Sequence, residues 1–486
     1  MPSATQEVRP VVELKRLNPG VVNRKDEYPR LANGTKVLVT TGGTIADATI
    51  SQLSAAGCLV TTLSLLEEGQ GVGGVLISSG SCTRAVDGQE VVVHAGQVAD
   101  RFSSEVDAGR LVIEGTRLLL EAAVAAGSVK AFVFASSASV VFGDEDFQSA
   151  ISEDAPYPTK FIDPVSAGTA EAERAVLRAT ATTGGGGGGA GNGDGSSRGT
   201  MLTCSVRAAP VYGPGQHQPE SSLVGGLASR AKRGIRSLGD GKNVVDFVYA
   251  GNVAHALLLA AQGLLEPKTP SQAPGDGVNS SPPPAAAAAG RAFFVTDAEP
   301  VPYSEFAGRA LSRLGYPAPA EGSGIPLAIA EVLAFLLRVM ALVLSPIFEF
   351  RPALTTRRIA EEGRACRLDV STARQELGYS PLWTQEEGLD MTLRNAESLR
   401  NPAAKVKHVG PFTAAEVARH SSEDDAWIIV DGKVYDITPY LGQHPGGDAM
   451  LRNAGGDSTE GMHGPQHPAQ AMEILEQHYI GKLETP

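Results

Sequence analysis

Apolar runs of strand type alternate with helical stretches between Lys36 and Arg207, and this alternation constrains the fold more than any other feature. The runs are short and rich in Val, Phe and Leu, as buried strands are. The rhythm predicts an α/β fold built on a doubly wound parallel sheet. The expected strands are Lys36–Thr40, Leu59–Leu63, Val91–His94, Ala131–Ala135 and Cys204–Arg207, with helices from Thr44 to about Ala56, at Ile113–Ala126 and at Glu171–Thr180.

The chain of 486 residues is longer than one ordinary domain. Residues 1–34 are expected to form a loose tail. Two stretches, about 183–199 and about 269–290, are predicted to be disordered insertions, because their Gly-rich and Ser/Pro/Ala-rich sequences cannot bury apolar area. The remaining sequence divides into a body at 35–395, a linker at 396–410 and a second domain at 411–484.

Composition excludes some functions. A formal net charge of −13 argues against general binding to nucleic acid. The four cysteines are widely spaced and lack metal-binding spacing, which indicates a reducing compartment. The N-terminal residues show no apolar signal-peptide core, and their acidic side chains argue against a transit peptide.

Several phrases in the second half of the body resemble one family. They are Arg207–Gly215 (RAAPVYGPG), Gly239–Tyr249, Asn252–Ala256, Phe293–Asp297 and Glu376–Tyr379. The body resembles the extended short-chain dehydrogenases of Rossmann type that oxidise the 3β-hydroxyl of steroids, particularly the sterol-4α-carboxylate 3-dehydrogenases. The resemblance implies hydride transfer from C3 to NAD(P), after which the β-keto acid loses carbon dioxide.

The dinucleotide turn departs from the family pattern. A pyrophosphate needs glycines that let backbone amides approach it at a helix N-terminus. Gly42, Gly43 and Thr44 keep the start of that turn, but Ile45 replaces its second glycine and is expected to occupy the pyrophosphate's space. Ser64 stands where an acidic residue would hold the ribose. These changes predict weakened binding of NAD(P).

The catalytic positions depart further. The resemblance places Val165 and Thr169 at the family's tyrosine and lysine, and loss of proton transfer alone costs about 10²–10⁴-fold in rate. Ser137 retains the hydroxyl that would polarise the substrate, although a plain serine turn explains it equally well. Tyr157 and Lys160 form a poor substitute pair, because their spacing is three and Pro158 opposes a helix. Whether the body is an enzyme therefore stays open, and we expect a degenerate or very slow dehydrogenase.

Residues 325–347 are almost wholly apolar, with Glu331 and Arg338 as the only charges. These two and Ser345 are spaced by seven and share one narrow strip of a helix. The segment is barely long enough to cross a bilayer, and Pro326 and Pro346 bound it. We expect a helix that lies in the membrane surface, with a buried core helix as the alternative.

The second domain contains His444-Pro-Gly-Gly447, a pattern in which an imidazole ligand is followed by residues that let the backbone close over a flat cofactor. His467 follows 23 residues later, far enough for a helix-loop-helix to bring it to the opposite face of a haem. Asp431-Gly432 between apolar runs predicts a hairpin. No Cys-x-x-Cys-His occurs, so covalent haem attachment is excluded.

These residues, with the closing Tyr479–Leu483, resemble the cytochrome b5 haem-binding domain. The resemblance implies haem b held by His444 and His467, and a role in electron transfer. Met462 stands where the family usually has an aromatic residue, and His463 is a rival ligand that fits the pattern less well.

Three functions follow as hypotheses. The first is a haem electron carrier tethered to a degenerate sterol-dehydrogenase body, the second an active bifunctional dehydrogenase, and the third a non-catalytic membrane scaffold. The resemblances imply a b5 reductase and a membrane sterol oxidase or desaturase as partners, a sterol as a ligand, and the cytosolic face of the endoplasmic reticulum membrane as the location. No nucleic-acid partner is expected.

Overall fold

The computed structural model divides the chain into two compact units, Met1–Arg313 with Pro317–Ser398, and Leu399–Pro486 with Leu314–Tyr316. It describes residues 28–484 except for the following positions: 30, 65, 68–74, 77, 97–104, 144–149, 185–200, 215–221, 236, 266–287, 319–323, 345–353, 355, 395, 397–398, 400–410, 424, 444–446, 465–466, 468 and 477.

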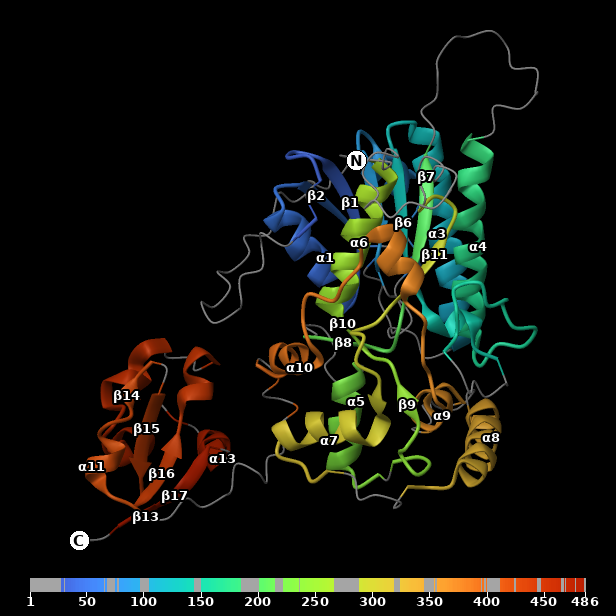
Figure 1. Cartoon of the computed structure of the whole chain (residues 1–486). Helices are drawn as coiled ribbons and strands as arrows, with labels where there is room; N and C mark the ends of the chain where they lie inside the picture. The colour runs from blue at the N-terminus through green and yellow to red at the C-terminus, as the bar shows by residue number, and fades with distance from the viewer. Residues whose placement is uncertain are drawn as a thin grey trace, which may run out of the picture. The chain divides into compact units, whose positions relative to one another are not determined.

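The larger unit is built on a six-stranded sheet in the order β11-β7-β6-β5-β1-β2, and every neighbouring pair in it is parallel. The predicted doubly wound α/β fold is therefore confirmed (Figure 1). The strands are β1 (Lys36–Thr41), β2 (Leu59–Ser64), β5 (Val91–His94), β6 (Ala131–Ser137), β7 (Leu202–Ala208) and β11 (Ala292–Val295).

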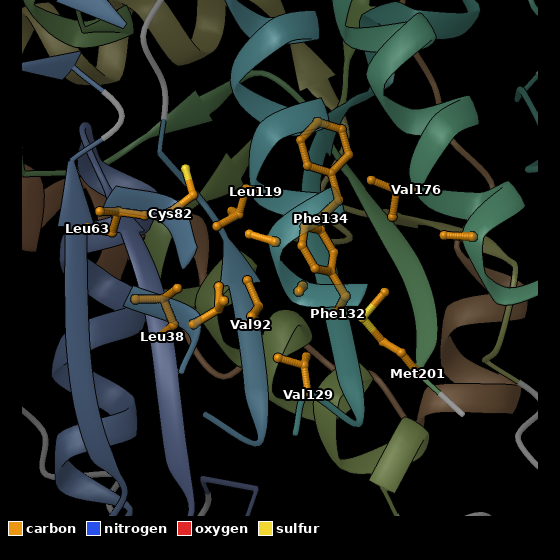
Figure 2. Close-up of a cluster of buried hydrophobic side chains, with 14 of the residues drawn as sticks. Leu38, Leu63, Cys82, Val92, Leu119, Val129, Phe132, Phe134, Val176 and Met201 are labelled. Atoms are coloured by element: carbon orange, nitrogen blue, oxygen red, sulfur yellow. The ribbon is translucent and has the colours of Figure 1, made fainter. Parts of the chain in front are cut away.

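Helices cover the sheet because the inner strands β5, β6 and β7 are buried on both faces, whereas the edge strand β2 is mostly exposed or half-buried. Figure 2 shows one of these cores, in which Leu38, Val92, Phe132 and Phe134 of the strands meet side chains such as Val176 of the helices. The helices of this core are α2 (Ser79–Val86), α3 (Glu105–Ala126) and α4 (Pro164–Gly184). Two others, α1 (Thr44–Ala55) and α6 (Ala250–Leu265), pack against each other.

The helices α3 and α4 approach very closely, because two glycines lie at their contact. A Cβ on Gly168 would lie 2.4 Å from the carbonyl oxygen of Gly109, and a Cβ on Gly109 would lie 2.4 Å from that of Pro164. The start of α4 is thereby fixed against α3 and the sheet.

The two predicted insertions fall mostly outside the described residues, but their edges do not. Helix α4 continues to Gly184, so it overlaps the predicted start of the first insertion. Residues 288–290 form a turn in which Ala288 is buried, so the second insertion ends earlier than predicted. A buried alanine beside a strand is a tertiary contact that composition does not reveal.

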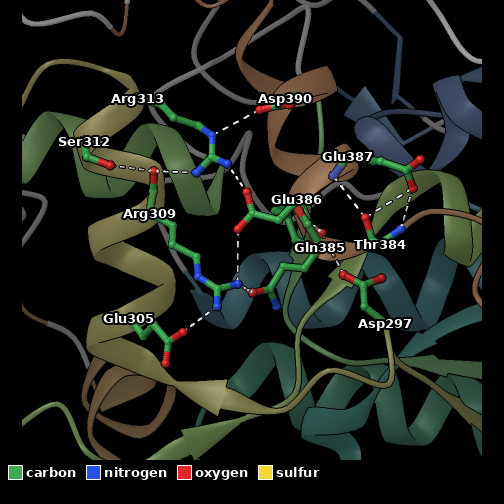
Figure 3. Close-up of polar contacts among 11 residues, drawn as sticks. Asp297, Glu305, Arg309, Ser312, Arg313, Thr384, Gln385, Glu386, Glu387 and Asp390 are labelled. Carbon is green, nitrogen blue, oxygen red and sulfur yellow. Dashed lines mark hydrogen bonds and ion pairs between the residues drawn. The ribbon is translucent and has the colours of Figure 1, made fainter.

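The larger unit also contains elements outside the six-stranded sheet. It contains the short strands β8 (Val211–Tyr212), β9 (Val244–Val245), β10 (Val248–Tyr249) and β12 (Val301–Pro302), and the helices α5 (Leu223–Lys232), α7 (Tyr303–Arg313), α8 (Leu327–Leu344), α9 (Thr356–Gly363) and α10 (Gln385–Leu393). Arginines of α7 bind acidic residues of α10, as Figure 3 shows: Arg309 and Arg313 both pair with Glu386, and Arg313 also pairs with Asp390.

The long apolar segment forms α8. Among the described residues, no helix combines the length and apolar character that a membrane crossing requires. One side of α8 is packed against the unit, through Leu327, Ala330, Ala334 and Leu337, whereas several of its other large apolar side chains are exposed. The alternative of a buried core helix is therefore wrong for the outer face of α8.

The smaller unit has a mixed five-stranded sheet in the order β13-β17-β16-β15-β14. Strands β15 (Asp425–Val430) and β16 (Lys433–Asp436) form the predicted hairpin, with Asp431 at φ 52° and Gly432 at φ 70°. Both residues thus have the positive φ that a type I′ turn requires. The other strands are β13 (Pro411–Phe412), β14 (Ser421–Ser422) and β17 (Tyr479–Leu483), and the helical segments are α11 (Ala414–Val417), η9 (Thr438–Gln443), η10 (Gly447–Asn453), α12 (Thr459–Met462) and α13 (Ala469–Glu476).

Candidate functional site

The glycine turn lies between β1 and α1, at the carboxyl end of β1, which is paired with β5 and with the edge strand β2. Gly42 has φ 125° and Gly43 has φ 88°, conformations that side chains rarely adopt, and Thr44 begins the helix. The backbone therefore forms the tight strand-to-helix turn that the sequence predicted, with the N-terminus of α1 beside it.

Ile45 is the second residue of α1, and its side chain is 1% exposed, so it packs inside the unit and does not face open solvent beside the turn. That it takes up space the pyrophosphate needs stays a prediction. Ser64 ends β2 and pairs in register with Thr41, so a serine does stand beside the turn at the end of the neighbouring strand.

A buried histidine, which sequence reasoning treated only as part of a strand, braces this edge of the sheet. His94 ends β5; its Nδ1 lies 2.9 Å from Thr40 Oγ1 and its Nε2 lies 2.9 Å from Thr116 Oγ1. Thr40 Oγ1 accepts the Gly96 N–H at 2.7 Å, and Thr116 Oγ1 donates to the Val112 carbonyl at 2.7 Å.

These contacts fix the tautomer. Because the Thr116 proton is used on a carbonyl, Thr116 accepts from Nε2–H, and Nδ1 then accepts from Thr40. Burial lowers the pKa of His94 to about 4, so the imidazole is neutral at pH 7. The sequence signal that could have identified His94 as a buried residue is a single histidine at the end of a run of valines.

Ser137 ends β6 and is half-buried. Its Oγ accepts from Ser139 Oγ at 2.9 Å and from the Ser139 N–H at 3.2 Å. Ser139 Oγ in turn lies 3.0 Å from Ser166 Oγ, which donates to Asp163 Oδ2 at 2.8 Å. Hydroxyls thus connect the end of β6 to the first turn of α4, where Asp163 also accepts the Ser166 N–H.

Val165 and Thr169 lie on α4, four residues apart and both half-buried. The Thr169 hydroxyl donates to the Val165 carbonyl at 2.8 Å, so it serves the helix backbone. Neither side chain can donate or accept a proton at neutral pH in the way that a tyrosine beside a lysine does.

Tyr157, the weak substitute candidate, is held by charged neighbours. Its hydroxyl donates to Glu173 Oε1 at 2.6 Å, and the Arg174 guanidinium lies 4.1 Å from the centre of its ring. Burial, together with the carboxylate of Glu173, raises the pKa of Tyr157 to about 12. Glu173 itself is fully buried and pairs with Arg207 at 2.8 Å, so these residues form a structural cluster.

In the smaller unit, His444 lies outside the described residues, whereas His467 is described and half-buried. The Nδ1 of His467 lies 2.9 Å from the carbonyl oxygen of Gly461. Histidines that bind a metal usually donate the second ring N–H to a carbonyl or carboxylate in this way, which orients Nε2 as the ligand atom.

The rival residue His463 is engaged elsewhere. Its Nε2 lies 2.9 Å from Asp431 Oδ2 in the hairpin turn, and its side chain is 54% exposed. An imidazole held on the surface by a carboxylate is a poor ligand for a haem in an apolar pocket. The geometry therefore favours His467 over His463.

The apolar side chains of this unit also fit a haem. A buried cluster, which includes Ile428 and Val430 of β15 and Leu475 of α13, is surrounded by half-buried apolar side chains. Of these, Leu441, Met450, Leu451, Met462 and Met472 lie in the helical segments, Ala454 follows η10 and Tyr479 lies on β17. Met462 belongs to this layer, so it provides apolar contact at the position where an aromatic residue was expected.

Comparison with known proteins agrees with both units. The model of the 3-beta hydroxysteroid dehydrogenase/isomerase family matches residues 70–323, and that of the cytochrome b5-like heme/steroid binding domain matches residues 413–484. The sterol-4-alpha-carboxylate 3-dehydrogenase, decarboxylating, of Mus musculus is 31% identical over 318 residues, which are 65% of this chain and 76% of the relative. A cytochrome B5-like protein of Arabidopsis thaliana is 46% identical over 92 residues, 18% of this chain and 76% of that protein.

Two plant relatives are longer. The 3beta-hydroxysteroid-dehydrogenase/decarboxylase isoforms 2 and 1 of Arabidopsis thaliana are each 30% identical, over 69% and 65% of this chain. The chain matches only 53% and 64% of their lengths, which is less than two thirds in both cases.

Solved structures support the fold. An epimerase, Mth375, of Methanothermobacter thermautotrophicus matches with a TM-score of 0.52 at 18% identity, over 78% of this chain and 97% of that one. The dTDP-glucose 4,6-dehydratase DesIV of Streptomyces venezuelae matches with a TM-score of 0.50 at 18% identity, over 76% and 99%.

The two matched families imply the cofactors. A cytochrome b5-like domain implies haem, and a short-chain dehydrogenase body implies NAD(P). The chain therefore belongs to the 3-beta hydroxysteroid dehydrogenase/isomerase family and carries a cytochrome b5-like domain in residues 413–484.

Proposed function

We propose that this protein is an electron carrier of sterol metabolism, in which a b5-type haem unit is joined to a sterol-dehydrogenase body that has lost its proton-transfer pair. The observation that carries the proposal is the hydrogen bond between His467 and the Gly461 carbonyl, beside a layer of half-buried apolar side chains. His467 and His444 would hold haem b through their imidazoles, and haem held in this way supplies one-electron transfer.

The protein's own residues have three tasks in this proposal. The Gly461 carbonyl would orient the His467 ring, and apolar side chains such as Met450, Met462 and Met472 would shield a bound haem from water. Exposed acidic residues, such as Glu423 and Glu460, give the unit negative charge for docking a basic partner.

The proposed partners are a b5 reductase as the electron donor and a membrane sterol oxidase or desaturase as the acceptor, at the cytosolic face of the endoplasmic reticulum membrane. The body would position the haem unit or hold a sterol. Support for slow or absent dehydrogenation comes from Val165 and Thr169, because neither side chain can replace a tyrosine and a lysine.

A second candidate function is an active NAD(P)-dependent 3β-hydroxysterol dehydrogenase that decarboxylates its product. Two observations favour it: the positive φ angles of Gly42 and Gly43, and the burial of the Ile45 side chain, which does not face open solvent beside the turn. The chain would then join two oxidoreductase steps in one protein.

One experiment separates these functions. The purified full chain, loaded with haem, is mixed with NADH or NADPH, first alone, then with a b5 reductase, and then with a 3β-hydroxysterol carboxylate. Reduction of the haem only when the reductase is present, without sterol turnover, supports the electron carrier. Rapid sterol oxidation supports the active dehydrogenase. A chain that shows neither reduction of the haem nor sterol turnover under any of these conditions leaves only a scaffold.

A further inference from the structure

Helix α12 carries the carbonyl group that holds His467, although little core packing holds the helix itself. It has four residues, Thr459–Met462, and none of its side chains is fully buried. A helix this short is unstable unless other parts of the protein hold it. A Cβ built on Gly461 would lie more than 4 Å from every described atom outside its own helix and its chain neighbours. The position of the Gly461 carbonyl therefore depends on the polar contacts of α12.

One residue of the hairpin turn contacts both ends of α12. The backbone N–H of Asp431 donates to Thr459 Oγ1 at 2.9 Å, and Thr459 is the first residue of the helix. The Nε2–H of His463, which directly follows the helix, donates to the Asp431 carboxylate at 2.9 and 3.1 Å. We call Asp431, Thr459 and His463 the α12 clamp. Gly461 lies between Thr459 and His463 in the chain.

The sheet of the smaller unit is the base of this clamp. Asp431 and Gly432 form the tight turn between β15 and β16, and the two strands pair in register up to that turn. Strand β15 also holds the residue before α12, because the Ser458 N–H donates to the Ile429 carbonyl at 2.7 Å. The clamp therefore ties both ends of α12 to the sheet.

The clamp reaches His467 through the backbone of α12. The His463 N–H donates to the Thr459 carbonyl at 3.1 Å, which closes the helical turn that contains Gly461. The Gly464 N–H donates to the Gly461 carbonyl at 3.2 Å. The same carbonyl lies 2.9 Å from Nδ1 of His467. A displacement of His463 would therefore move the group that orients the His467 ring.

We propose that the α12 clamp positions the haem ligand His467, because the contact between Asp431 and His463 keeps the Gly461 carbonyl in place to accept from the His467 ring. His463 then supports the ligand instead of competing with it. This inference rests on the proposed function, since it concerns His467 as a ligand of haem b.

The size of the effect follows from the kind of contact. Loss of a group that directly orients a metal-binding histidine changes metal affinity by about 10–100-fold. The clamp acts on such a group from two residues away, through an ion pair whose side chains are 54% and 47% exposed. Exposed pairs contribute little, so we expect a change of about 3-fold.

The test measures how fast the haem-loaded full chain releases haem to an excess of apomyoglobin. His463→Ala is expected to keep the two-imidazole spectrum and to release haem about 3-fold faster. Asp431→Gly removes the same contact and keeps the turn, which glycine favours, so it is expected to give the same rate. Because both changes remove one contact, the double variant is expected to be no faster than either. His463→Gln is expected to restore the natural rate, since its amide can donate to Asp431 in place of Nε2–H.

Electron paramagnetic resonance of the ferric iron gives a second readout, because its signal depends on the orientation of the two imidazole rings. His463→Ala and Asp431→Gly are expected to shift or broaden this signal, and His463→Gln is expected to keep it. The matched control is Lys433→Ala, which removes an ion pair with Glu476 of similar exposure in the same unit. It is expected to change neither readout.

Natural release rates and natural signals in both His463→Ala and Asp431→Gly would overturn the inference. So would an equal change in Lys433→Ala, or a double variant that is about 9-fold faster, as independent contacts would make it.

A natural chain that takes up no haem with the two-imidazole spectrum would contradict the proposed function instead. The clamp is then tested in the haem-free chain by hydrogen exchange of the Gly464 amide, which donates to the Gly461 carbonyl. Exchange is expected to be about 3-fold faster in His463→Ala and unchanged in His463→Gln. Equal exchange in the natural chain and both variants would overturn the inference.

Discussion

Restoring the family's catalytic pair on α4 is the sharpest test of what the larger unit has lost. Val165 and Thr169 are separated by four residues, so their side chains lie about 40° apart around the helix and about 6 Å apart along it. Both are half-buried, whereas their neighbours Ser166, Gly168 and Ala170 are buried. The face that carries positions 165 and 169 therefore has room for larger side chains.

The expected gain follows from the chemistry of the pair. A positioned proton-transfer group contributes about 10²–10⁴-fold in rate, which corresponds to roughly 3–5 kcal/mol in the activation free energy. The hydroxyl chain from Ser137 through Ser139 to Ser166 already connects β6 to this turn of α4. We therefore expect Val165→Tyr/Thr169→Lys to raise the NAD(P)-dependent oxidation of a 3β-hydroxysterol carboxylate by a factor in this range.

The assay follows NAD(P)H absorbance with the purified full chain, and NAD(P)H fluorescence measures cofactor binding separately. Val165→Phe/Thr169→Met is the matched control, because it adds similar volume without a proton-transfer group. A natural chain that already turns over as fast as the restored variant, with cofactor bound in both, would refute the reasoning.

Four further predictions concern residues around this site. Glu173→Gln leaves the buried Arg207 without its countercharge and is expected to cost about 3–5 kcal/mol of unfolding free energy, measured by thermal or urea unfolding, whereas Glu173→Leu/Arg207→Met is expected to cost less. Tyr157→Phe is expected to leave any sterol turnover at neutral pH unchanged, because the raised pKa of Tyr157 excludes it as a base; a large loss of turnover would contradict this assignment. Burial lowers the pKa of His94 in the folded state to about 4, below the usual value near 6.5. Neutral His94 therefore contributes about 3 kcal/mol to the free energy of unfolding above pH 6.5, and this contribution is lost as the pH falls toward 4. In urea unfolding, the free energy of unfolding of His94→Gln should fall less between about pH 6.5 and pH 4 than that of the natural chain. Gly96→Ala places a Cβ 2.6 Å from the Thr41 carbonyl oxygen, so it is expected to lower both the melting temperature and the affinity for NAD(P)H. An unchanged affinity would show that Gly96 does not influence the glycine turn after β1.

The sequence was sufficient to predict features that depend on local pattern. The apolar runs located five of the six strands of the main sheet, all except β11, and the paired glycines after β1 predicted a turn whose φ angles only glycine favours. The Asp431-Gly432 pair predicted the hairpin for the same reason. These features depend on residues that are close together in the chain.

What the sequence could not give depends on contacts between distant residues. Ile45 was predicted to obstruct the pyrophosphate, and only the structure shows that its side chain is buried. Tyr157 was a weak candidate base in the sequence, and the structure shows that its hydroxyl donates a hydrogen bond to Glu173, 16 residues away. His94 forms a hydrogen bond with Thr40, 54 residues away, and no short motif encodes this contact.

The candidate haem ligands show both what the sequence could predict and what it could not. The sequence pattern predicted His444 and His467 as the pair and ranked His463 below His467, but it gave no physical reason that keeps His463 from the haem. That choice depends on Asp431, which lies 32 residues before His463 and holds it at the surface.

The most direct test of the proposed function is the absorption spectrum of the full chain reconstituted with haem, compared among His444→Ala, His467→Ala and His463→Ala. The natural chain is expected to bind one haem with the low-spin spectrum of an iron that carries two imidazoles, and to be reduced by a b5 reductase. His444→Ala and His467→Ala are expected to lose that spectrum, and His463→Ala to keep it. A natural chain without the two-imidazole spectrum, or a spectrum lost with His463→Ala and kept with His467→Ala, would contradict the account.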